Sequence, residues 1–445
     1  MRRLQSAVLL GVLLPWANSA SADPLAEAKA ASEAFAALSP AERQAVRDRA
    51  IRAVCDLELM PPELDTKPDP SKFGFARLTY AMNGGMAMTK GGRLWATWVA
   101  GGDSVRGFTV GSWSDDGGRT WADTRFRVGS DEPEFYIGWT GIHVTHHIPQ
   151  VWVAPDGTLR LYVYQGVGMF NQRGATFEFV CRDPDAAVPV WERPRLVALG
   201  SIHNKPTVLR DGTWICPVDC EDYSWWWLKT DVFPDLKDLH VCGVLASTDR
   251  GRSWVPRGGT RPEAERHYTE HSIVERDDGT LHMLMRTGLG PMESVSADAG
   301  RSWSKPVVSS VVRQHRSRMA YIRLQSGRML LVKNGTKANE ISARFGKPGV
   351  FRDRAELAAY VSEDGGRTWK GGLLLDPRDN VAYPDAFQAA DGSVYVSYEH
   401  NRETENAEIL FARFRETDVL SGGITSPDAS LRNVVFSARP KASCK

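Results

Sequence analysis

Short apolar runs separated by turn residues make up most of this chain from about residue 75 onward. Trp95–Val99 and Phe108–Gly111 are two such runs, and the turn Gly101-Gly102-Asp103 lies between them. Short runs rich in β-branched and aromatic residues and bounded by Gly, Asp or Pro are typical of β-strands. The pattern therefore predicts a large all-β region.

The segment before this region has a helical pattern. Apolar residues recur there at three- and four-residue spacing. They are Leu25, Ala28, Ala31, Phe35 and Leu38. The run Ser39-Pro40-Ala41-Glu42 has the features of a capping box with proline at the first helical position, which predicts a second helix over about 41–55. We therefore expect a helical N-terminal segment, residues 23–60, that packs against the β region.

The motif Ser-x-Asp-x-Gly-x-Thr/Ser-Trp occurs four times in the β region. The copies are Ser114–Trp121, Ser247–Trp254, Ser296–Trp303 and Ser362–Trp369. The motif suits a hairpin turn, because its Asp accepts hydrogen bonds from turn N–H groups and its Gly tolerates a positive φ. The Trp is expected to bury against the neighbouring strand. Four copies indicate repeated structural units.

A second repeat, a Gly turn followed by an apolar strand, interleaves with the first. Its six copies lie at intervals of 48 to 67 residues and begin at Gly92, Gly157, Gly212, Gly279, Gly327 and Gly392. Such an interval accommodates one four-stranded blade. Six copies therefore predict an all-β fold, a six-bladed β-propeller over residues 75–425, followed by a C-terminal tail, 426–445. A β-sandwich would not repeat both motifs in step.

The N-terminus has the features of an export signal. Arg2 and Arg3 precede the apolar run Ala7–Trp16, and Ala20-Ser21-Ala22 supplies the small residues of a cleavage site. We interpret residues 1–22 as a signal peptide cleaved after Ala22, since the apolar run is too short to span a bilayer. No later segment is apolar enough to do so. The mature protein is expected to be periplasmic or secreted.

Charge and cysteine content narrow the classes of partner. The formal net charge of +1 becomes −1 when the two arginines of the signal peptide are removed. A chain without basic excess cannot neutralise many phosphates, which argues against nucleic acid as a partner. The Cys216-x3-Cys220 spacing is unusual for zinc. We therefore expect one or two disulfides around Cys216–Cys242 rather than a metal site.

The four Ser-x-Asp-x-Gly-x-Thr/Ser-Trp motifs resemble the Asp boxes of the sialidase superfamily, and the resemblance covers about residues 75–420. Non-catalytic propellers share the Asp box, so it implies the fold and not the activity. Sialidases cleave a glycoside whose anomeric carbon carries a carboxylate. They use a Tyr nucleophile activated by Glu, because a carboxylate nucleophile would be repelled. An Asp is the acid/base, and three arginines bind the substrate carboxylate through their bidentate, permanently charged guanidinium groups.

Three residues match the catalytic set of this family. Tyr383 lies in Ala-Tyr-Pro-Asp-Ala where the family has Ala-Tyr-Ser-Asp-Leu, and Tyr398-Glu399 ends the next strand as the family pattern does. Glu270 opens a blade, with His-Ser after it in place of Cys-Gln. Asp103 stands 11 residues before the first Asp-box Ser. The resemblance implies that Tyr383 is the nucleophile, Glu270 its activator and Asp103 the acid/base. The alternatives are a core tyrosine at a strand start and an ordinary turn aspartate.

The arginines match the family in two positions out of three. Arg286 follows the Asp-Gly turn on the next strand, and Arg354 stands eight residues before the last Asp-box Ser. The family's first Arg, in an Arg-Ile-Pro run, is missing, and Asn83 stands near its place. Either Arg77 or Arg106 compensates, or the ligand is not held as an ordinary sialic-acid carboxylate.

Further polar residues gather at the predicted blade starts, which line the central funnel of a propeller. His147, Lys205 and Arg318 are candidate substrate contacts among them. His146 next to His147 suggests a metal, but no third ligand with suitable spacing follows, so hydrogen bonding to sugar hydroxyls or structural packing is the preferred interpretation. Trp225-Trp226-Trp227 is either a sugar-stacking surface or an aromatic cap on the rim.

These observations together predict a sialidase-like exo-glycoside hydrolase that removes a terminal sialic acid or related acidic sugar from a glycan with retention of configuration. No metal or organic cofactor is expected. The first alternative is the same chemistry on a different sugar. The second is a glycan-binding propeller without activity. The Tyr, Glu, Asp and two Arg in order favour an enzyme, whereas the missing first Arg favours divergence.

Overall fold

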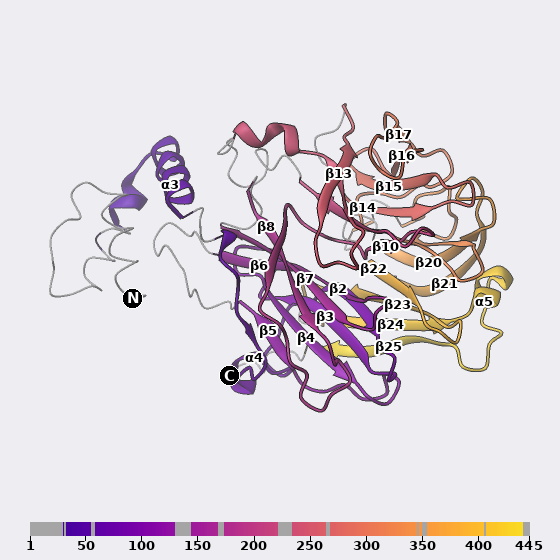
Figure 1. Cartoon of the computed structure of the whole chain (residues 1–445). Coiled ribbons are helices and arrows are strands. Elements are labelled where there is room, and N and C mark those ends of the chain that lie inside the picture. Colours follow the sequence, from indigo (N-terminus) through magenta and orange to yellow (C-terminus); the bar gives the residue numbers. More distant parts are fainter. Residues whose placement is uncertain are drawn as a thin grey trace.

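The computed structural model describes residues 30, 33–54, 58–129, 144–167, 173–220, 234–263, 268–344, 347–348, 354–404 and 406–438. Six antiparallel sheets are arranged in a ring (Figure 1), which confirms the predicted six-bladed β-propeller. Each sheet is built from strands that are consecutive in the chain. The first strands of blades 1 and 2, 1 and 6, 4 and 5, and 5 and 6 contact one another around the central axis.

The first three blades contain thirteen of the strands. Blade 1 consists of β2 (Met82–Met88), β3 (Leu94–Ala100), β4 (Phe108–Ser114) and β5 (Phe126–Val128), with β1 (Leu64–Asp65) added outside β5. Blade 2 consists of β6 (Val144–Val153), β7 (Leu159–Val167), β8 (Ala175–Cys181) and β9 (Arg195–Leu199). Blade 3 consists of β10 (Thr207–Val208), β11 (Trp214–Asp219), β12 (Cys242–Ser247) and β13 (Val255–Thr260).

The other three blades have four strands each. Blade 4 consists of β14 (Tyr268–Glu275), β15 (Leu281–Thr287), β16 (Met292–Ser296) and β17 (Val307–Val308). Blade 5 consists of β18 (Ala320–Arg323), β19 (Met329–Asn334), β20 (Ala355–Ser362) and β21 (Lys370–Asp379). Blade 6 consists of β22 (Val381–Gln388), β23 (Val394–His400), β24 (Glu408–Phe414) and β25 (Ser430–Ser437). The helices are α3 (Pro40–Val54), α4 (Pro70–Phe73), η4 (Pro234–Leu239) and α5 (Glu416–Ser421).

The two sequence repeats occupy equivalent turns. Each of the six Gly turns joins the first and second strands of its blade, with φ between 83° and 89°. The Asp boxes follow the third strand of blades 1, 3, 4 and 5. In the first box, Asp116 Oδ1 accepts from Ser114 Oγ at 2.7 Å and from the Thr120 N–H at 2.9 Å. Trp121 packs against Phe411 of the preceding blade, with ring centroids 6.3 Å apart.

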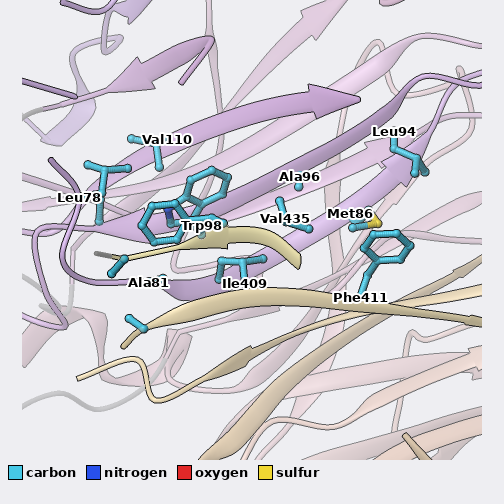
Figure 2. Close-up of a cluster of buried hydrophobic side chains, with 14 of the residues drawn as sticks. Leu78, Ala81, Met86, Leu94, Ala96, Trp98, Val110, Ile409, Phe411 and Val435 are labelled. Atoms are coloured by element: carbon cyan, nitrogen blue, oxygen red, sulfur yellow. The ribbon is translucent and has the colours of Figure 1, made fainter. Parts of the chain in front are cut away.

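A shared apolar core between blades 1 and 6 closes the ring. Figure 2 shows Trp98 and Val110 of the first blade facing Ile409 and Val435 of the last. Trp98 also stacks on Phe436, with ring centroids 5.4 Å apart. Because the first and last sheets exchange no strand, this side-chain packing between the chain's two ends joins them.

The start of the second predicted helix agrees with the sequence pattern, whereas the last blade extends further along the chain than the pattern indicated. The capping box is present, since the Ser39 N–H donates to Glu42 Oε2 at 2.8 Å and the Glu42 N–H donates to Ser39 Oγ at 3.3 Å. Figure 1 shows α3 to one side of the six sheets. The sequence analysis ended the propeller at residue 425, whereas β25 extends blade 6 to Ser437.

The disulfide prediction is wrong for the described cysteines. Cys181, Cys216, Cys220 and Cys242 are buried thiols, and no disulfide joins any two of them. Burial raises the pKa of Cys220 to about 12, so this thiol is protonated and unreactive at neutral pH. The other two cysteines and the proposed signal peptide lie outside the described residues. Within the described part of the chain, none of the helices has the length and apolar character needed to cross a membrane.

Candidate active site

Tyr383 and Glu270 both lie at β-bulges on the innermost strands. The register of β22 with β23 shifts between Ala382 and Asp385, and that of β14 with β15 shifts between Thr269 and Ser272. Tyr383 and Glu270 have φ angles of 54° and 53°, a left-handed conformation that costs free energy in a residue other than glycine. Bulges of this kind re-aim a side chain, and here they turn both residues toward a common partner.

That partner is Arg286 on β15. Its Nη1 atom lies 2.5 Å from Glu270 Oε1 and 2.9 Å from the Tyr383 hydroxyl oxygen. Burial alone would raise the pKa of Glu270, but the charges of Arg286 and other nearby cations outweigh it and lower the pKa to about 2. Glu270 is therefore ionised. The Tyr383 oxygen accepts from Arg286, which leaves its own proton to donate. Glu270 Oε2 has no hydrogen-bond partner among the described residues.

Two further guanidinium groups face the Tyr383 ring. The Cζ atoms of Arg354 and Arg402 lie 4.9 and 4.8 Å from the ring centroid. Glu399 lies beside both, 3.8 Å from Arg354 Nη1 and 3.4 Å from Arg402 Nη1. Burial and the neighbouring charge of Arg402 together lower the pKa of Arg354 to about 10. Arg354 and Arg402 are thus buried cations beside the tyrosine ring, a setting that suits an anionic ligand.

Asp103 reaches this cluster from the turn between β3 and β4. Its Oδ2 lies 3.4 Å from Arg402 Nη2, and its side chain is 32% exposed. His147 lies next to the turn, with Nε2 3.2 Å from the Gly102 carbonyl oxygen. Burial lowers the pKa of His147 despite the nearby Asp103, so the ring is neutral and supports the turn. The acid of the predicted set is thus the most solvent-accessible member.

Arg318 and Lys205, two of the predicted substrate contacts, bind other groups of the protein inside the funnel. Arg318 donates to the backbone carbonyls of four residues in three blades, with its Cζ 5.2 Å from the Tyr383 ring centroid. These residues are Asn83, Gly84, His203 and Tyr383. Lys205 forms a buried ion pair with Asp385 at a cavity of about 860 Å³ lined by the far ends of the inner strands. Lys205 lines this cavity, whereas Tyr383, Glu270 and Arg286 do not.

The cluster contains a third arginine in place of the missing one, and the sequence analysis did not identify it. Arg77 donates to the Ser71 carbonyl at 2.7 Å and Arg106 is exposed, so neither is held at the Tyr383 cluster as a replacement. Arg402, in the turn after β23, supplies the third guanidinium instead. Asn83 donates to the Tyr383 carbonyl at 2.8 Å and so supports the tyrosine backbone. The only sequence signal for Arg402 is its position three residues after Glu399, and no motif marks it.

Three buried side chains with potential metal-ligand atoms lie next to the Glu270 backbone. Asp219, Cys242 and His271 place one potential ligand atom each within 4.8 Å of one another, and all three side chains are buried. Asp219 and His271 are already hydrogen bonded in this structure. His147 is not part of the group.

Comparison with known proteins agrees with this architecture. Residues 92–396 match the family described as a BNR repeat-like domain. The chain therefore belongs to this family, whose repeats are the Asp boxes, and it is a sialidase-like propeller.

Solved sialidases share the fold at low sequence identity. The Hadza microbial sialidase Hz136 is 20% identical with a TM-score of 0.54, and the match covers 73% of this chain but only 65% of that one. The intramolecular trans-sialidase from Ruminococcus gnavus, solved with oseltamivir carboxylate, is 13% identical with a TM-score of 0.56 over 78% of this chain and 96% of that one. The leech intramolecular trans-sialidase, solved with 2,7-anhydro-Neu5Ac, is 13% identical with a TM-score of 0.57, and the match covers 78% of this chain and 69% of that one. At these identities the likeness concerns the fold.

Proposed function

We propose that this protein is a retaining exo-glycoside hydrolase that removes a terminal sialic acid or a related acidic sugar from a glycan. The observation that carries the proposal is the Tyr383 hydroxyl, held at 2.9 Å by the same Arg286 nitrogen that pairs with Glu270. A buried tyrosine that needs only packing does not require a carboxylate and two more guanidinium groups around it. This arrangement supports a nucleophile next to an anion-binding site.

In the proposed reaction, Glu270 Oε2 accepts the Tyr383 proton while the tyrosine oxygen attacks the anomeric carbon. Asp103 donates a proton to the departing glycosidic oxygen. A glycosyl–tyrosine bond forms as the glycosidic bond breaks. Asp103 then removes a proton from water, which attacks the same carbon, and the Tyr383 oxygen leaves and recovers its proton from Glu270. Two displacements give net retention. The neutral nucleophile avoids repulsion by a carboxylate on the sugar.

The acidic group of the substrate is assigned to Arg286, Arg354 and Arg402. All three guanidinium groups lie within 6 Å of the Tyr383 ring, at 5.9, 4.9 and 4.8 Å. Arginine suits a carboxylate because it offers two parallel N–H donors. A relative in the same fold was solved with oseltamivir carboxylate, a carboxylate ligand.

The position of Arg402 favours a second candidate, the same chemistry on an acidic sugar other than sialic acid. Arg402 approaches from blade 6, whereas Asn83 of blade 1 stands where the family resemblance places the arginine. A carboxylate carried elsewhere on the ring would suit a cation that approaches from another direction. A panel of aryl glycosides of sialic and uronic acids, with neutral sugars as controls, separates the two candidates.

The mechanism is tested with Tyr383→Phe, which keeps the ring and removes the oxygen. We expect turnover of the best panel substrate to fall by at least about a hundred-fold with the melting temperature little changed. Tyr321→Phe is the matched control, because Tyr321 is a buried tyrosine whose hydroxyl bonds His282 at 2.9 Å, away from the Tyr383 cluster. A fluorinated glycosyl fluoride should trap the sugar on the peptide that contains Tyr383. Label on another residue, or undiminished turnover in Tyr383→Phe, would refute the Tyr nucleophile.

A further inference from the structure

A buried carboxylate–imidazole pair lies behind Glu270, between blades 3 and 4. Asp219, the last residue of β11, accepts from the Glu270 backbone N–H at 2.6 Å and from the Thr269 hydroxyl at 3.0 Å through Oδ2. Its other oxygen lies 2.6 Å from Nδ1 of His271. Asp219 thus contacts the residues on both sides of Glu270 as well as Glu270 itself.

Both ring nitrogens of His271 lie beside oxygen atoms. Nε2 lies 2.8 Å from the Gly243 carbonyl oxygen, which can only accept, and Nδ1 lies 2.6 Å from the Asp219 carboxyl group, which accepts when ionised. With Asp219 ionised, both ring nitrogens carry protons, and the charge of the imidazolium balances the buried carboxylate.

The backbone of Glu270 is fixed on its other side as well. Asn204 Nδ2 donates to the Glu270 carbonyl at 2.8 Å and to the His271 carbonyl at 3.0 Å. Glu270 has a φ of 53°, a conformation that persists only where the surroundings impose it. One bond to its N–H and one to its C=O do so here. They aim the carboxylate at Arg286.

The geometry is less suited to a metal ion shared with Cys242. Two ligands bound to zinc at tetrahedral angles lie about 3.3 Å apart for bond lengths of about 2.0–2.1 Å. Asp219 Oδ1 and His271 Nδ1 are 2.6 Å apart, which is the length of a strong hydrogen bond. Asp219 Oδ2 is occupied by two donors.

We propose that the Asp219–His271 ion pair is a positioning device for Glu270, which holds the bulge of β14 in the conformation that presents the carboxylate to Arg286 and Tyr383. The catalytic part of this inference rests on the proposed function. Asp219 and His271 do not touch the proposed reacting atoms, so they act through Glu270. His271 stands in the place of the Cys in the Cys-Gln that follows the glutamate in the family pattern.

The first experiment tests for the Asp219–His271 ion pair and needs no substrate. Ring-¹⁵N-labelled histidine in the full chain should give two protonated nitrogens for His271, a signal identified by its loss in His271→Gln. Hydrogen exchange of the Glu270 amide should be slow and should accelerate by at least about tenfold in Asp219→Ala. A neutral or metal-bound ring, or an unprotected amide, would overturn the proposal. Stoichiometric zinc in elemental analysis, lost in Cys242→Ser, would assign the group to a metal instead.

The second experiment tests whether Asp219 and His271 position Glu270 for catalysis. His271→Gln should lower kcat about ten- to a hundred-fold with KM within about twofold, because a small displacement of the proton acceptor slows chemistry more than binding. Asp219→Asn retains an acceptor for the Glu270 N–H and should recover part of the rate that Asp219→Ala loses. The control is His282→Gln, since His282 is a buried histidine 2.8 Å from Glu293 on the same blade but away from the site.

Equal loss of activity in His282→Gln and His271→Gln would show a merely structural role and overturn the positioning proposal. If the wild-type chain hydrolyses none of the glycosides, the proposed function fails. The nitrogen signals and the exchange rate of the Glu270 amide then still decide whether the ion pair holds this bulge.

Discussion

Tyr383 is surrounded by four arginine side chains, and these arginines have two different tasks. Arg318 uses its Nη atoms to bind backbone carbonyls of three blades, so its charge supports the funnel. Arg354 and Arg402 instead face the ring, and both lie beside the carboxylate of Glu399. Burial raises the pKa of Glu399, opposed by these two arginines. An anionic ligand would relieve the repulsion between the cations.

The residue-scale prediction concerns Arg402. Arg402→Met keeps the aliphatic volume and removes one charge-assisted bond to the substrate's acidic group, worth about 1.5–3 kcal/mol. We expect KM for the acidic substrate to rise about ten- to a hundred-fold, since about 1.4 kcal/mol is tenfold. Steady-state kinetics on the preferred aryl glycoside measure it. Arg328→Met, which removes surface ion pairs with Glu363 and Glu416, is the control. An unchanged KM in Arg402→Met would remove Arg402 from the binding site.

The Asp-box turns make the blades sensitive to acid. In the box of blade 4, Ser302 donates to Asp298 from its hydroxyl at 2.6 Å and from its backbone N–H at 2.8 Å, and Ser296 donates at 2.8 Å. These bonds hold the pKa of Asp298 well below its usual 3.8. A carboxylate whose pKa is lowered on folding stabilises the protein above the pKa of the unfolded chain. This contribution is lost as the pH falls through the folded-state value.

The element-scale prediction follows from this sign. The wild-type melting temperature should decline as the pH is lowered from about 5 toward 2. Asp298→Asn should lower the melting temperature at pH 7 and show a shallower decline in acid, because one of the titrating groups is gone. Calorimetry across this pH range tests both parts. Asp238→Asn, at an exposed position in η4, should match the wild-type curve. A curve for Asp298→Asn parallel to wild type would contradict the assignment.

At the scale of the whole molecule, the closing contact between blades 1 and 6 depends on β25. Phe436 of this strand is buried and packs edge-on against Phe75 at 5.3 Å as well as stacking on Trp98. Because no described strand is shared between the first and last sheets, the ring is joined by apolar side-chain packing and by hydrogen bonds such as the one from Asn83 to the Tyr383 carbonyl. Opening this contact would also release Asp103 of blade 1 from Arg402 of blade 6.

The corresponding prediction is that Phe436→Ala lowers the free energy of unfolding by about 3–5 kcal/mol, the cost of removing a buried phenylalanine. Urea denaturation measures it. Val434 lies on the same strand with 48% of its surface exposed, so Val434→Ala should stay within about 0.5 kcal/mol of wild type. Similar values for the two variants would show that β25 does not secure the ring.

Local patterns in the sequence were sufficient to predict the six blades. Each Gly turn requires a positive φ that favours glycine, and each Asp box satisfies its own turn through bonds within eight residues, so six blades were predicted from short stretches read separately. The capping box at Ser39 was predicted for the same reason. Tyr383, Glu270, Arg286 and Arg354 were identified by their resemblance to family motifs, and the fold brings these four together.

The tertiary structure decided what depends on residues far apart in the chain. Arg402 contacts Asp103, 299 positions away in the chain, and Asp219 accepts from the Glu270 N–H, 51 positions away. No local motif marks Arg402 or Asp219, because the packing of the blades determines which residues they contact. The thiol state of Cys216 and Cys242 likewise depends on where the blades place them. Hydrogen bonds within a turn are encoded by neighbouring residues, whereas a funnel assembled from six strand ends exists only once the ring has closed.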